Sequence, residues 1–260
     1  MGRRLGQHFL TRKSILDRIA SSAVPENQPD NNACVIEIGA GRGALTEALM
    51  ERAAKVTAIE VDPVLVHYLQ QKFRDAVESG RLELVEGDVL KTEFPETGAP
   101  ITIAGNLPYY ITSPILERVF ALGTRWARAV FLVQAEVAAR LAASPGGREY
   151  GYLSVLTQIH ARAEILFDVP RTAFRPAPKV DSAVVLLEPR DAAGEWNLPD
   201  KRAFLRFASA CFQHKRKTLR NNLAPSYGKE RMDALAEGRL RAEQLSVPQL
   251  AALYRQLEAA

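Results

Sequence analysis

The alternation of short apolar runs with segments of helical periodicity between residues 33 and 143 constrains the fold more than any other feature. Apolar runs rich in β-branched residues occur at 33–41, 55–62, 81–88, 101–110 and 128–134. The segments between them, at 44–52, 63–73 and 113–122, repeat apolar residues at the spacing of a buried helix face. Such an alternation is typical of a parallel sheet with helices on both of its faces.

Two further strand-like runs, 163–169 and 182–189, follow on either side of a proline-rich segment. Residues 189–200 resemble a linker, and residues 200–260 show helical periodicity without a strand candidate. A chain of 260 residues with 47% apolar composition can bury a core in each of two modest domains. We predict an α/β domain over residues 1–190 and a small all-helical domain over residues 191–260.

A glycine-rich turn follows the first predicted strand, with Gly39, Gly41 and Gly43 at alternate positions. Glycines let the backbone turn sharply and come close to a ligand. The turn lacks the spacing of the dinucleotide fingerprint, and no phosphate-binding lysine follows it as in a P-loop. Glu37 precedes the turn, where a carboxylate suits a ligand with ammonium and sulfonium charges better than a pyrophosphate. The pattern therefore favours S-adenosylmethionine over NAD as the cofactor.

Carboxylates also stand at the ends of the next two predicted strands. Glu60 follows the glycine turn by about 20 residues, the position at which such sheets bind ribose hydroxyls. Asp88 ends the third strand, where a carboxylate can accept a hydrogen bond from an adenine amine. Each of these features alone could be an ordinary turn or a solvated acid. Together with the glycines they predict a nucleoside pocket at the carboxyl ends of the strands.

The sequence Asn106-Leu107-Pro108-Tyr109 ends the fourth predicted strand, beside this pocket. An exocyclic adenine amine is a poor nucleophile, because its lone pair is delocalised into the ring. Hydrogen bonds to the Asn106 side-chain oxygen and the Leu107 carbonyl would favour a pyramidal nitrogen and aim it at a methyl group. Pro108 stiffens the turn, and Tyr109 offers a face for base stacking. Catalysis by this set would consist mostly of positioning.

At these residues the sequence resembles the ribosomal RNA adenine N6-dimethyltransferases of the KsgA type, over nearly the whole chain. The resemblance rests on residues 6–10, 37–43, 106–110 and 174–182, with Glu60 and Asp88. It implies a Rossmann-like class I methyltransferase domain with a mostly parallel seven-stranded sheet, and a small helical C-terminal domain. It also implies S-adenosylmethionine-dependent dimethylation of two adjacent adenosines near the 3′ end of 16S rRNA in the small ribosomal subunit.

The resemblance further implies site roles. Phe174 would stack on the base opposite Tyr109, and Asn106, Leu107 and Pro108 would shape the base site. The family commonly has Asn at position 8, where this chain has His8, so we expect an altered contact there. The cofactor-binding residues implied by the turn and the resemblance together are His8, Leu10, Glu37, Gly39, Gly41, Glu60, Asp88 and Asn106.

Basic residues suggest where RNA binds. The formal net charge is +4, and residues 201–223 are expected to form one amphipathic helix with a basic side. The N-terminal arm adds Arg3, Arg4, Arg12 and Lys13. Such patches suit phosphate contacts, although a solvated helix face has the same pattern. Residues 8–10 would either fold over the cofactor as a lid or pack in the core. The target base must leave its stack to reach the pocket.

Other interpretations stay open at this stage. The chain could be a non-catalytic RNA-binding factor in subunit assembly with a role in ribosome biogenesis, or a sister large-subunit enzyme of the erythromycin-resistance type. A DNA adenine methyltransferase is disfavoured, because no DNA-recognition insert is found. We expect a cytoplasmic monomer without a metal site, since Cys34 and Cys211 stand apart and no apolar run reaches the roughly 20 residues that span a membrane.

Overall fold

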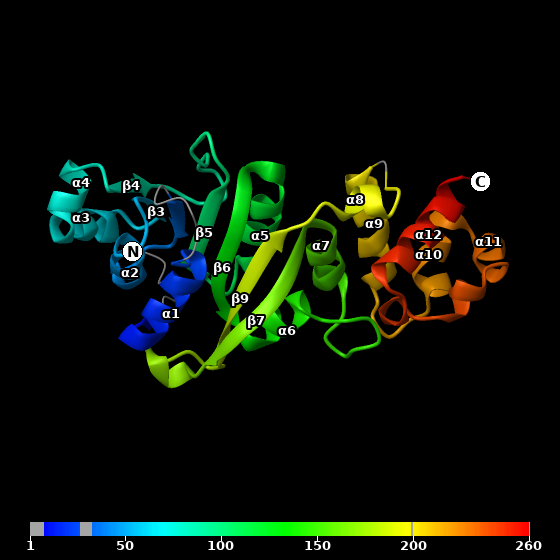
Figure 1. Ribbon diagram of the computed structural model, residues 1–260. Helices are drawn as coiled ribbons and strands as arrows, with labels where there is room; N and C mark the ends of the chain where they lie inside the picture. Colours follow the sequence, from blue (N-terminus) through cyan, green and yellow to red (C-terminus); the bar gives the residue numbers. More distant parts are fainter. Residues whose placement is uncertain (1–7, 27–32, 199, 260) are drawn as a thin grey trace. The chain divides into compact units, whose positions relative to one another are not determined.

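The computed structural model describes residues 8–26, 33–198 and 200–259 (Figure 1). They divide into two compact units, residues 1–138 with 164–189, and residues 139–163 with 190–260. The second change of unit falls after residue 189, one residue before the predicted boundary, and residues 139–163 belong to the second unit. None of the helices in the described ranges is long and apolar enough to cross a bilayer.

A seven-stranded sheet forms the first unit, in the order β4-β3-β2-β5-β6-β9-β7. The pairs β2–β3, β3–β4, β2–β5 and β5–β6 are parallel, while β9 runs antiparallel to β6. Each strand overlaps a run that the sequence predicts, and the predicted fold class is confirmed. The strands are β2 (Cys34–Ile38), β3 (Lys55–Glu60), β4 (Leu82–Glu86), β5 (Ile101–Asn106), β6 (Trp126–Gln134), β7 (Ala161–Val169) and β9 (Ser182–Pro189).

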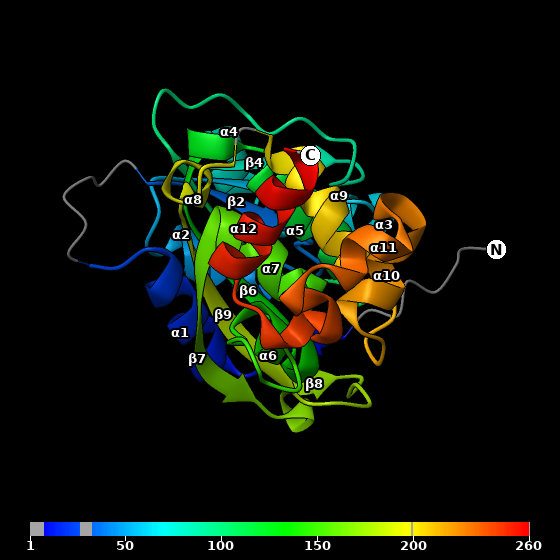
Figure 2. The same ribbon diagram turned by 90° about the vertical axis from the view of Figure 1, so that its right-hand side faces the viewer.

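Helices cover both faces of this sheet. Helices α1 and α2 bury Ile19 and Leu49 in a cluster that also takes Val130 and Leu132 of β6. Because neighbouring strand residues point to opposite faces, the buried Phe131 lies on the other face, where α5 is seen in Figure 2. The helices of this part of the chain are α1 (Lys13–Ala23), α2 (Ala44–Met50), α3 (Pro63–Lys72), α4 (Arg74–Glu78), α5 (Thr112–Phe120) and α6 (Ala135–Leu141).

Helix starts follow from local chemistry. Asp62 accepts a hydrogen bond from Val64 N at 2.9 Å and Pro63 opens α3, as expected for a capped N-terminus. Asp200 caps α9 (Lys201–Phe212) by accepting from two backbone N–H groups at 2.8 and 3.0 Å. Ser246 and Gln249 form a capping box at the start of α12 (Val247–Glu258). These caps satisfy backbone donors that would otherwise lack partners.

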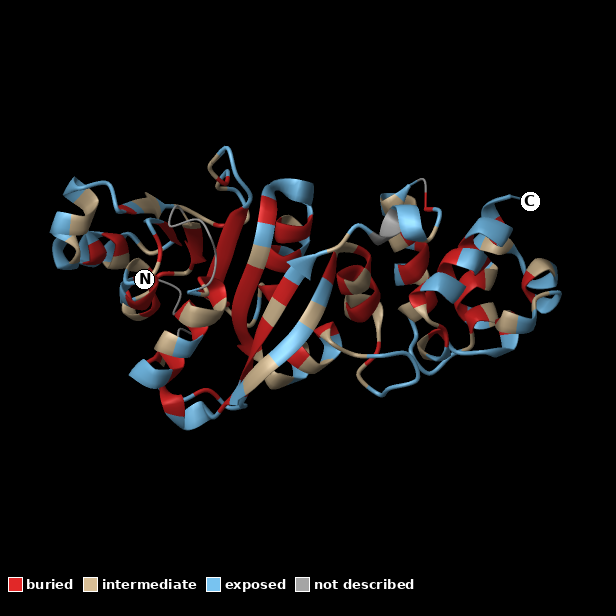
Figure 3. Cartoon of the chain, viewed as in Figure 1, coloured by how far each residue is buried: buried red, intermediate tan, exposed pale blue. Residues whose placement is uncertain are grey.

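The second unit is helical around its own core, which appears as a separate set of buried residues in Figure 3. Phe204, Phe207, Leu223 and Leu250 belong to this core, as does Tyr150 from the segment 139–163. That packing explains why residues 139–163 cluster with the C-terminal helices. The helices are α7 (Tyr152–His160), α8 (Ala192–Glu195), α9 (Lys201–Phe212), α10 (Leu219–Tyr227), α11 (Lys229–Asp233) and α12 (Val247–Glu258).

The prediction of one helix over residues 201–223 is wrong. Helix α9 ends at Phe212, and α10 begins at Leu219. The buried Asn222 side chain donates to the Cys211 carbonyl at 2.7 Å and to the His214 carbonyl at 3.3 Å. Carbonyls at the end of a helix need such partners, and this contact allows the chain to turn after α9. The basic residues 215–217 therefore lie exposed in a loop.

Candidate functional site

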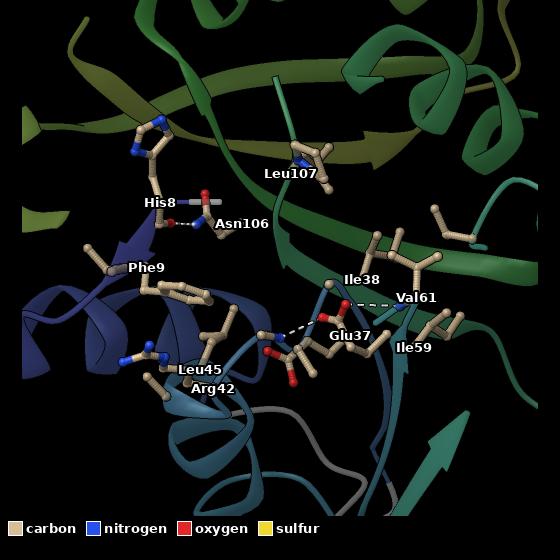
Figure 4. A pocket seen from close by; sticks show the side chains of 18 of the residues that line it. His8, Phe9, Glu37, Ile38, Arg42, Leu45, Ile59, Val61, Asn106 and Leu107 are labelled. Carbon is tan, nitrogen blue, oxygen red and sulfur yellow. Dashed lines mark hydrogen bonds between the residues drawn. The ribbon is translucent and has the colours of Figure 1, made fainter. Parts of the chain in front are cut away.

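A cavity of about 590 Å³ lies at the carboxyl ends of the parallel strands, entirely within the first unit (Figure 4). Its walls come from β1 (Phe9–Leu10), the glycine turn after β2, and the residues that follow β3, β4 and β5. This is the edge at which open α/β sheets bind ligands. The predicted site residues that line it are His8, Leu10, Glu37, Gly39, Gly41, Glu60, Asp88, Asn106, Leu107, Pro108 and Tyr109.

Glu60 fastens the glycine turn to the end of β3. Its Oε2 atom accepts from Gly41 N at 2.8 Å, and its Oε1 atom accepts from the backbone N–H groups of Val61 and Asp62 at 2.9 and 3.0 Å. A carboxylate offers about four acceptor positions, so three are in use. The arrangement leaves room for one further donor, whereas the sequence predicts two ribose hydroxyls. A second hydroxyl would have to displace one of the backbone donors.

Glu37 is a buried acid at the base of the cavity. Only 1% of the residue is exposed, and its Oε2 atom accepts a hydrogen bond from the Thr46 hydroxyl at 2.6 Å. Burial raises the pKa of Glu37 from 4.5 to about 7; the Thr46 hydrogen bond opposes this rise, and the charge of Glu60 adds to it. A positive ligand beside Glu37 would favour its ionised form. A positive ligand in the cavity would therefore increase the negative charge on Glu37.

Asp88 follows β4 and keeps part of its carboxylate available. Its Oδ1 atom accepts from Leu90 N at 2.9 Å, which holds the side chain in a tight turn. No donor among the described residues contacts its second oxygen. That oxygen can accept a hydrogen bond from an amine inside the cavity.

Asn106 ends β5, and its side chain has a defined orientation. Its Nδ2 atom donates to the His8 backbone carbonyl at 2.9 Å, which Figure 4 shows as a dashed line. Because a carbonyl only accepts, this bond assigns the amide nitrogen to His8 and leaves the Asn106 oxygen as an acceptor. The Leu107 N–H donates to the Leu132 carbonyl at 3.0 Å, which ties the following turn to β6. Within the described ranges, no donor contacts the Leu107 carbonyl.

Tyr109 is half-buried, and both its hydroxyl and its ring contact other side chains. Its hydroxyl shares a hydrogen bond with Ser182 Oγ at 2.7 Å, and its ring stacks beside the His8 ring with centroids 6.1 Å apart. Burial raises the pKa of the Tyr109 hydroxyl, and the Ser182 bond opposes this effect. The hydroxyl therefore stays protonated near neutral pH and serves as an anchor for the ring.

The structure does not support the predicted stacking of Phe174 on the base. Phe174 is fully buried in the core and does not line the cavity. Its strand, β8 (Phe174–Arg175), pairs with β1 so that Phe174 opposes Leu10. Arg175 and its partner Phe9 line the cavity. Arg175 is not predicted from the sequence, because a two-residue strand gives no periodic signal, whereas Phe9 belongs to the segment 8–10, for which a lid is one of the two interpretations.

The described part of the N-terminal arm is anchored rather than free. Leu10 is buried, and the Thr11 N–H and hydroxyl both donate to the Ala173 carbonyl, at 3.0 and 3.1 Å. Of the two interpretations of residues 8–10, this favours packing for Leu10, while Phe9 and His8 still form a wall of the cavity. Arg3 and Arg4 lie outside the described residues.

The chain is similar to known proteins along almost its whole length. A family model for ribosomal RNA adenine dimethylases matches residues 2–258. The curated protein "Ribosomal RNA small subunit methyltransferase A" of Levilactobacillus brevis is 44% identical over 87% of this chain and 76% of its own length. The protein of the same name from Chlorobium chlorochromatii is 40% identical over 97% of this chain and 92% of its own length.

Solved structures agree with these relatives. A dimethyladenosine transferase from Plasmodium falciparum is 25% identical with a TM-score of 0.78, over 96% of this chain and 98% of that one. The 23S rRNA methyltransferase ErmE is 28% identical with a TM-score of 0.70, over 96% and 99%. The match to the family model covers almost the whole chain, including every residue of the cavity that the structure describes. The chain thus belongs to the ribosomal RNA adenine dimethylase family.

Proposed function

We propose that the chain transfers methyl groups from S-adenosylmethionine to the N6 amines of two adjacent adenosines near the 3′ end of 16S rRNA in the small ribosomal subunit. Membership of the family and the names of the relatives at 40–44% identity support this substrate. The observation that carries the chemistry is the Asn106–His8 hydrogen bond, because it turns the Asn106 oxygen into a free acceptor beside the Leu107 carbonyl.

The cavity suits the methyl donor. Asp88 has an oxygen for the adenine amine, Glu60 has one acceptor position for a ribose hydroxyl, and Glu37 complements the positive charges. At Gly41 a Cβ atom would lie 3.1 Å from the Phe9 ring, so the turn leaves this side of the cavity open only as glycine. S-adenosylmethionine would supply an electrophilic methyl group on a sulfonium.

The acceptor amine would be held by two carbonyl oxygens, one from the Asn106 side chain and one from the Leu107 backbone. Both belong to a turn that is tied to β6 through Leu107 N and to His8 through the Asn106 amide. Pro108 also fixes this turn, since its carbonyl accepts from Ile111 N and from the Thr112 hydroxyl, each at 3.1 Å. A rigid pair of acceptors lowers the entropy cost of aligning the amine.

RNA recognition would rely on phosphate contacts and on a base that leaves its stack. Exposed basic residues suited to phosphates occur in both units, with Arg12 and Lys13 in the first. The second unit contributes Arg202, Arg206, Lys215, Arg216 and Lys217. Action on ribosomal subunits would place the protein in the cytoplasm. We also propose that the active form is a monomer.

The test supplies labelled S-adenosylmethionine and immature small subunits, followed by digestion to nucleosides. We expect N6,N6-dimethyladenosine, mapped to adjacent positions. Asn106→Ala should abolish transfer while largely sparing the fold. Gln70→Ala, which removes an amide from the exposed side of α3, is the matched control and should transfer normally. Absence of the dimethylated nucleoside with the unaltered protein would refute the proposal.

The similarity to ErmE supports one second candidate function, methylation of the large subunit. The same assay with large subunits or naked 23S rRNA separates the two, and we expect label only in small subunits. A role in subunit assembly is compatible with catalysis. If the Asn106→Ala protein still supports maturation of small subunits, the role in assembly does not require methyl transfer.

A further inference from the structure

Arg118 lies on α5 and contacts the segment that follows β4 from outside the cavity. Its Nη1 atom donates to the Leu90 carbonyl at 3.0 Å, and its Nη2 atom donates to the Thr92 carbonyl. The guanidinium also lies over the Phe94 ring, 5.3 Å from the ring centroid. Leu90 lines the cavity, and Arg118 does not. The guanidinium therefore supports a wall of the cavity from behind.

The supported segment, residues 88–92, is a tight turn built on Asp88. The Asp88 carbonyl accepts hydrogen bonds from the N–H groups of Lys91 and Thr92, each at 2.8 Å, and from the Thr92 hydroxyl at 3.0 Å. The Asp88 Oδ1 atom accepts from Leu90 N at 2.9 Å. The orientation of the Asp88 carboxylate thus depends on where residues 90 and 92 lie, and Arg118 binds the carbonyls of those two residues.

The planar guanidinium suits this contact better than an ammonium group would. Its two terminal nitrogens have a fixed separation, so donation to the carbonyls of Leu90 and Thr92 sets the spacing between them. Arg118 is half-buried, and its Nε atom is buried without a hydrogen-bond partner among the described residues. A buried donor without a partner costs free energy. Because both terminal nitrogens bind the turn, the side chain is directed at the protein rather than at an RNA phosphate.

Helix α5 is a fixed base for this side chain. The helix begins at Thr112, whose hydroxyl donates to the Pro108 carbonyl at 3.1 Å in the turn that follows β5. Arg118 stands less than two helical turns further along the same helix. Arg118 therefore extends from a helix whose start is already held by a hydrogen bond, and it can keep the Asp88 turn at a set position.

We propose that Arg118 is a positioning residue for methyl transfer: through its two carbonyl contacts it holds the turn of residues 88–92 so that the Asp88 carboxylate can accept from the adenine amine of the donor. This inference rests on the proposed function. Arg118 touches neither the donor nor the RNA in this role and acts only through the turn. Its loss should therefore weaken one hydrogen bond to the donor and leave the binding of RNA unchanged.

Two arginines of this region provide a matched pair of substitutions. Arg125 donates to the carbonyls of Phe94 and Pro95 at 3.1 and 3.5 Å, in the same segment but beyond the Asp88 turn. Arg118→Met and Arg125→Met each remove a guanidinium that binds two carbonyls, and only the first should disturb Asp88. Arg118→Lys keeps the charge but not the planar pair of donors, so its effect should lie between those of Arg118→Met and the unaltered protein.

The first measurement compares calorimetric affinities for S-adenosylhomocysteine and S-inosylhomocysteine, whose base lacks the adenine amine. The unaltered protein should prefer the adenosyl compound by about 10-fold or more, because a hydrogen bond to a charged group is lost with the amine. Arg118→Met should bind the adenosyl compound about 3- to 10-fold more weakly and prefer it by less than about threefold. Arg125→Met should keep the affinity and the preference of the unaltered protein.

Transfer kinetics provide a second measurement. Arg118→Met should raise the KM for S-adenosylmethionine, while kcat at saturating donor and the KM for small subunits stay nearly unchanged. Urea unfolding of both methionine variants measures any general loss of stability, which by itself would not change the ratio of the two affinities. If Arg118→Met does not fold, Arg118→Lys takes its place in the same comparison.

Three results would overturn the inference. Arg118→Met could bind both compounds as the unaltered protein does, or weaken both by the same factor, which would leave Arg118 with a purely structural role. Equal loss of the preference in Arg125→Met would show that the effect is not specific to the Asp88 turn. Failure of the unaltered protein to methylate small subunits would instead refute the proposed function, and the affinity comparison does not depend on that activity.

Discussion

The Thr46 hydroxyl donates to the Glu37 carboxyl group at 2.6 Å, in a place where both residues are buried. Thr46 lies on α2 and Glu37 on β2, so this bond joins the two elements that flank the glycine turn. A single neutral hydrogen bond does not offset the cost of burying a charged carboxylate. We therefore expect the protonation state of Glu37 to affect both the free energy of unfolding and the affinity for a cationic ligand in the cavity.

Glu37 should make stability depend on pH. Its pKa is about 7 in the folded protein against 4.5 as the ordinary value. Between these values the folded state holds an extra proton, so stability falls as pH rises through this window. Glu37→Gln has no ionisable group at this position and lacks this loss. The free energy of unfolding of the variant, relative to that of the unaltered protein, should therefore increase by on the order of 3 kcal/mol between about pH 4 and 8. Urea unfolding at several pH values measures it; a difference that does not change with pH would contradict the assignment.

Donor binding should release protons near neutral pH. A cationic ligand beside Glu37 favours the carboxylate, so the affinity for S-adenosylmethionine should rise as pH increases up to about the pKa of 7. Calorimetry in two buffers with different ionisation enthalpies counts the released protons. Glu37→Gln should abolish the release and weaken binding. S-adenosylhomocysteine, which lacks the sulfonium charge, should show a smaller release than the donor.

Gly43 and Gly80 form a matched pair for testing the turn. Both have positive φ angles, 76° and 77°, but a Cβ at Gly43 would lie 2.5 Å from the Phe73 ring, while one at Gly80 would meet nothing within 4 Å. Gly80→Ala should cost roughly 1–2 kcal/mol for the left-handed backbone alone. Gly43→Ala should cost about 1–3 kcal/mol more through overpacking. Equal losses in chemical denaturation would show that the Phe73 contact relaxes freely.

Asn222 should matter for the helical unit far more than its neighbour Asn221. Asn222 is buried and bonds the Cys211 and His214 carbonyls, whereas Asn221 is exposed. Asn222→Ala should lower stability by about 1–3 kcal/mol, because it leaves a buried carbonyl without a partner. Asn221→Ala should change stability by less than about 0.5 kcal/mol. Far-UV circular dichroism during urea unfolding compares the two.

The loop between α9 and α10 should contribute phosphate contacts. Arg216 and Lys217 are exposed there. Changing both to Ala should weaken binding to small subunits at low salt, and should reduce the slope of log affinity against log salt by about 1 for each phosphate that the variant no longer binds. The double change Arg74→Ala with Lys91→Ala removes the same charge from exposed positions elsewhere and serves as the control. Equal effects of the two double variants would indicate a general charge effect.

Most of the sheet and the cavity can be predicted from the sequence. The strands are short runs of apolar and β-branched residues, and their carboxyl ends meet at one edge in any parallel sheet. Glu60, Asp88 and Asn106 could therefore be assigned to a common cavity without coordinates. The capped start of α3 at Asp62 likewise depends only on local residue types.

The structure departs from the sequence expectations at contacts between residues far apart in the chain. Phe174 is predicted at the base site because its segment resembles the family, yet the structure buries it fully in the core. The continuous helix through residues 201–223 is predicted from periodicity, which contains no information about a side chain such as Asn222 that bonds back to the end of α9. Neither tertiary contact has a local signature.

The helical unit consists of two separate stretches of chain, 139–163 and 190–260. A protein truncated after residue 190 would keep Tyr150, Val155 and Ile159 but lose the partners that bury them, leaving three large apolar side chains in water. To exchange this unit between related enzymes, both stretches of chain must be replaced. A chimera in which only residues 190–260 are replaced would combine residues 139–163 of one enzyme with C-terminal helices of another in the same hydrophobic core.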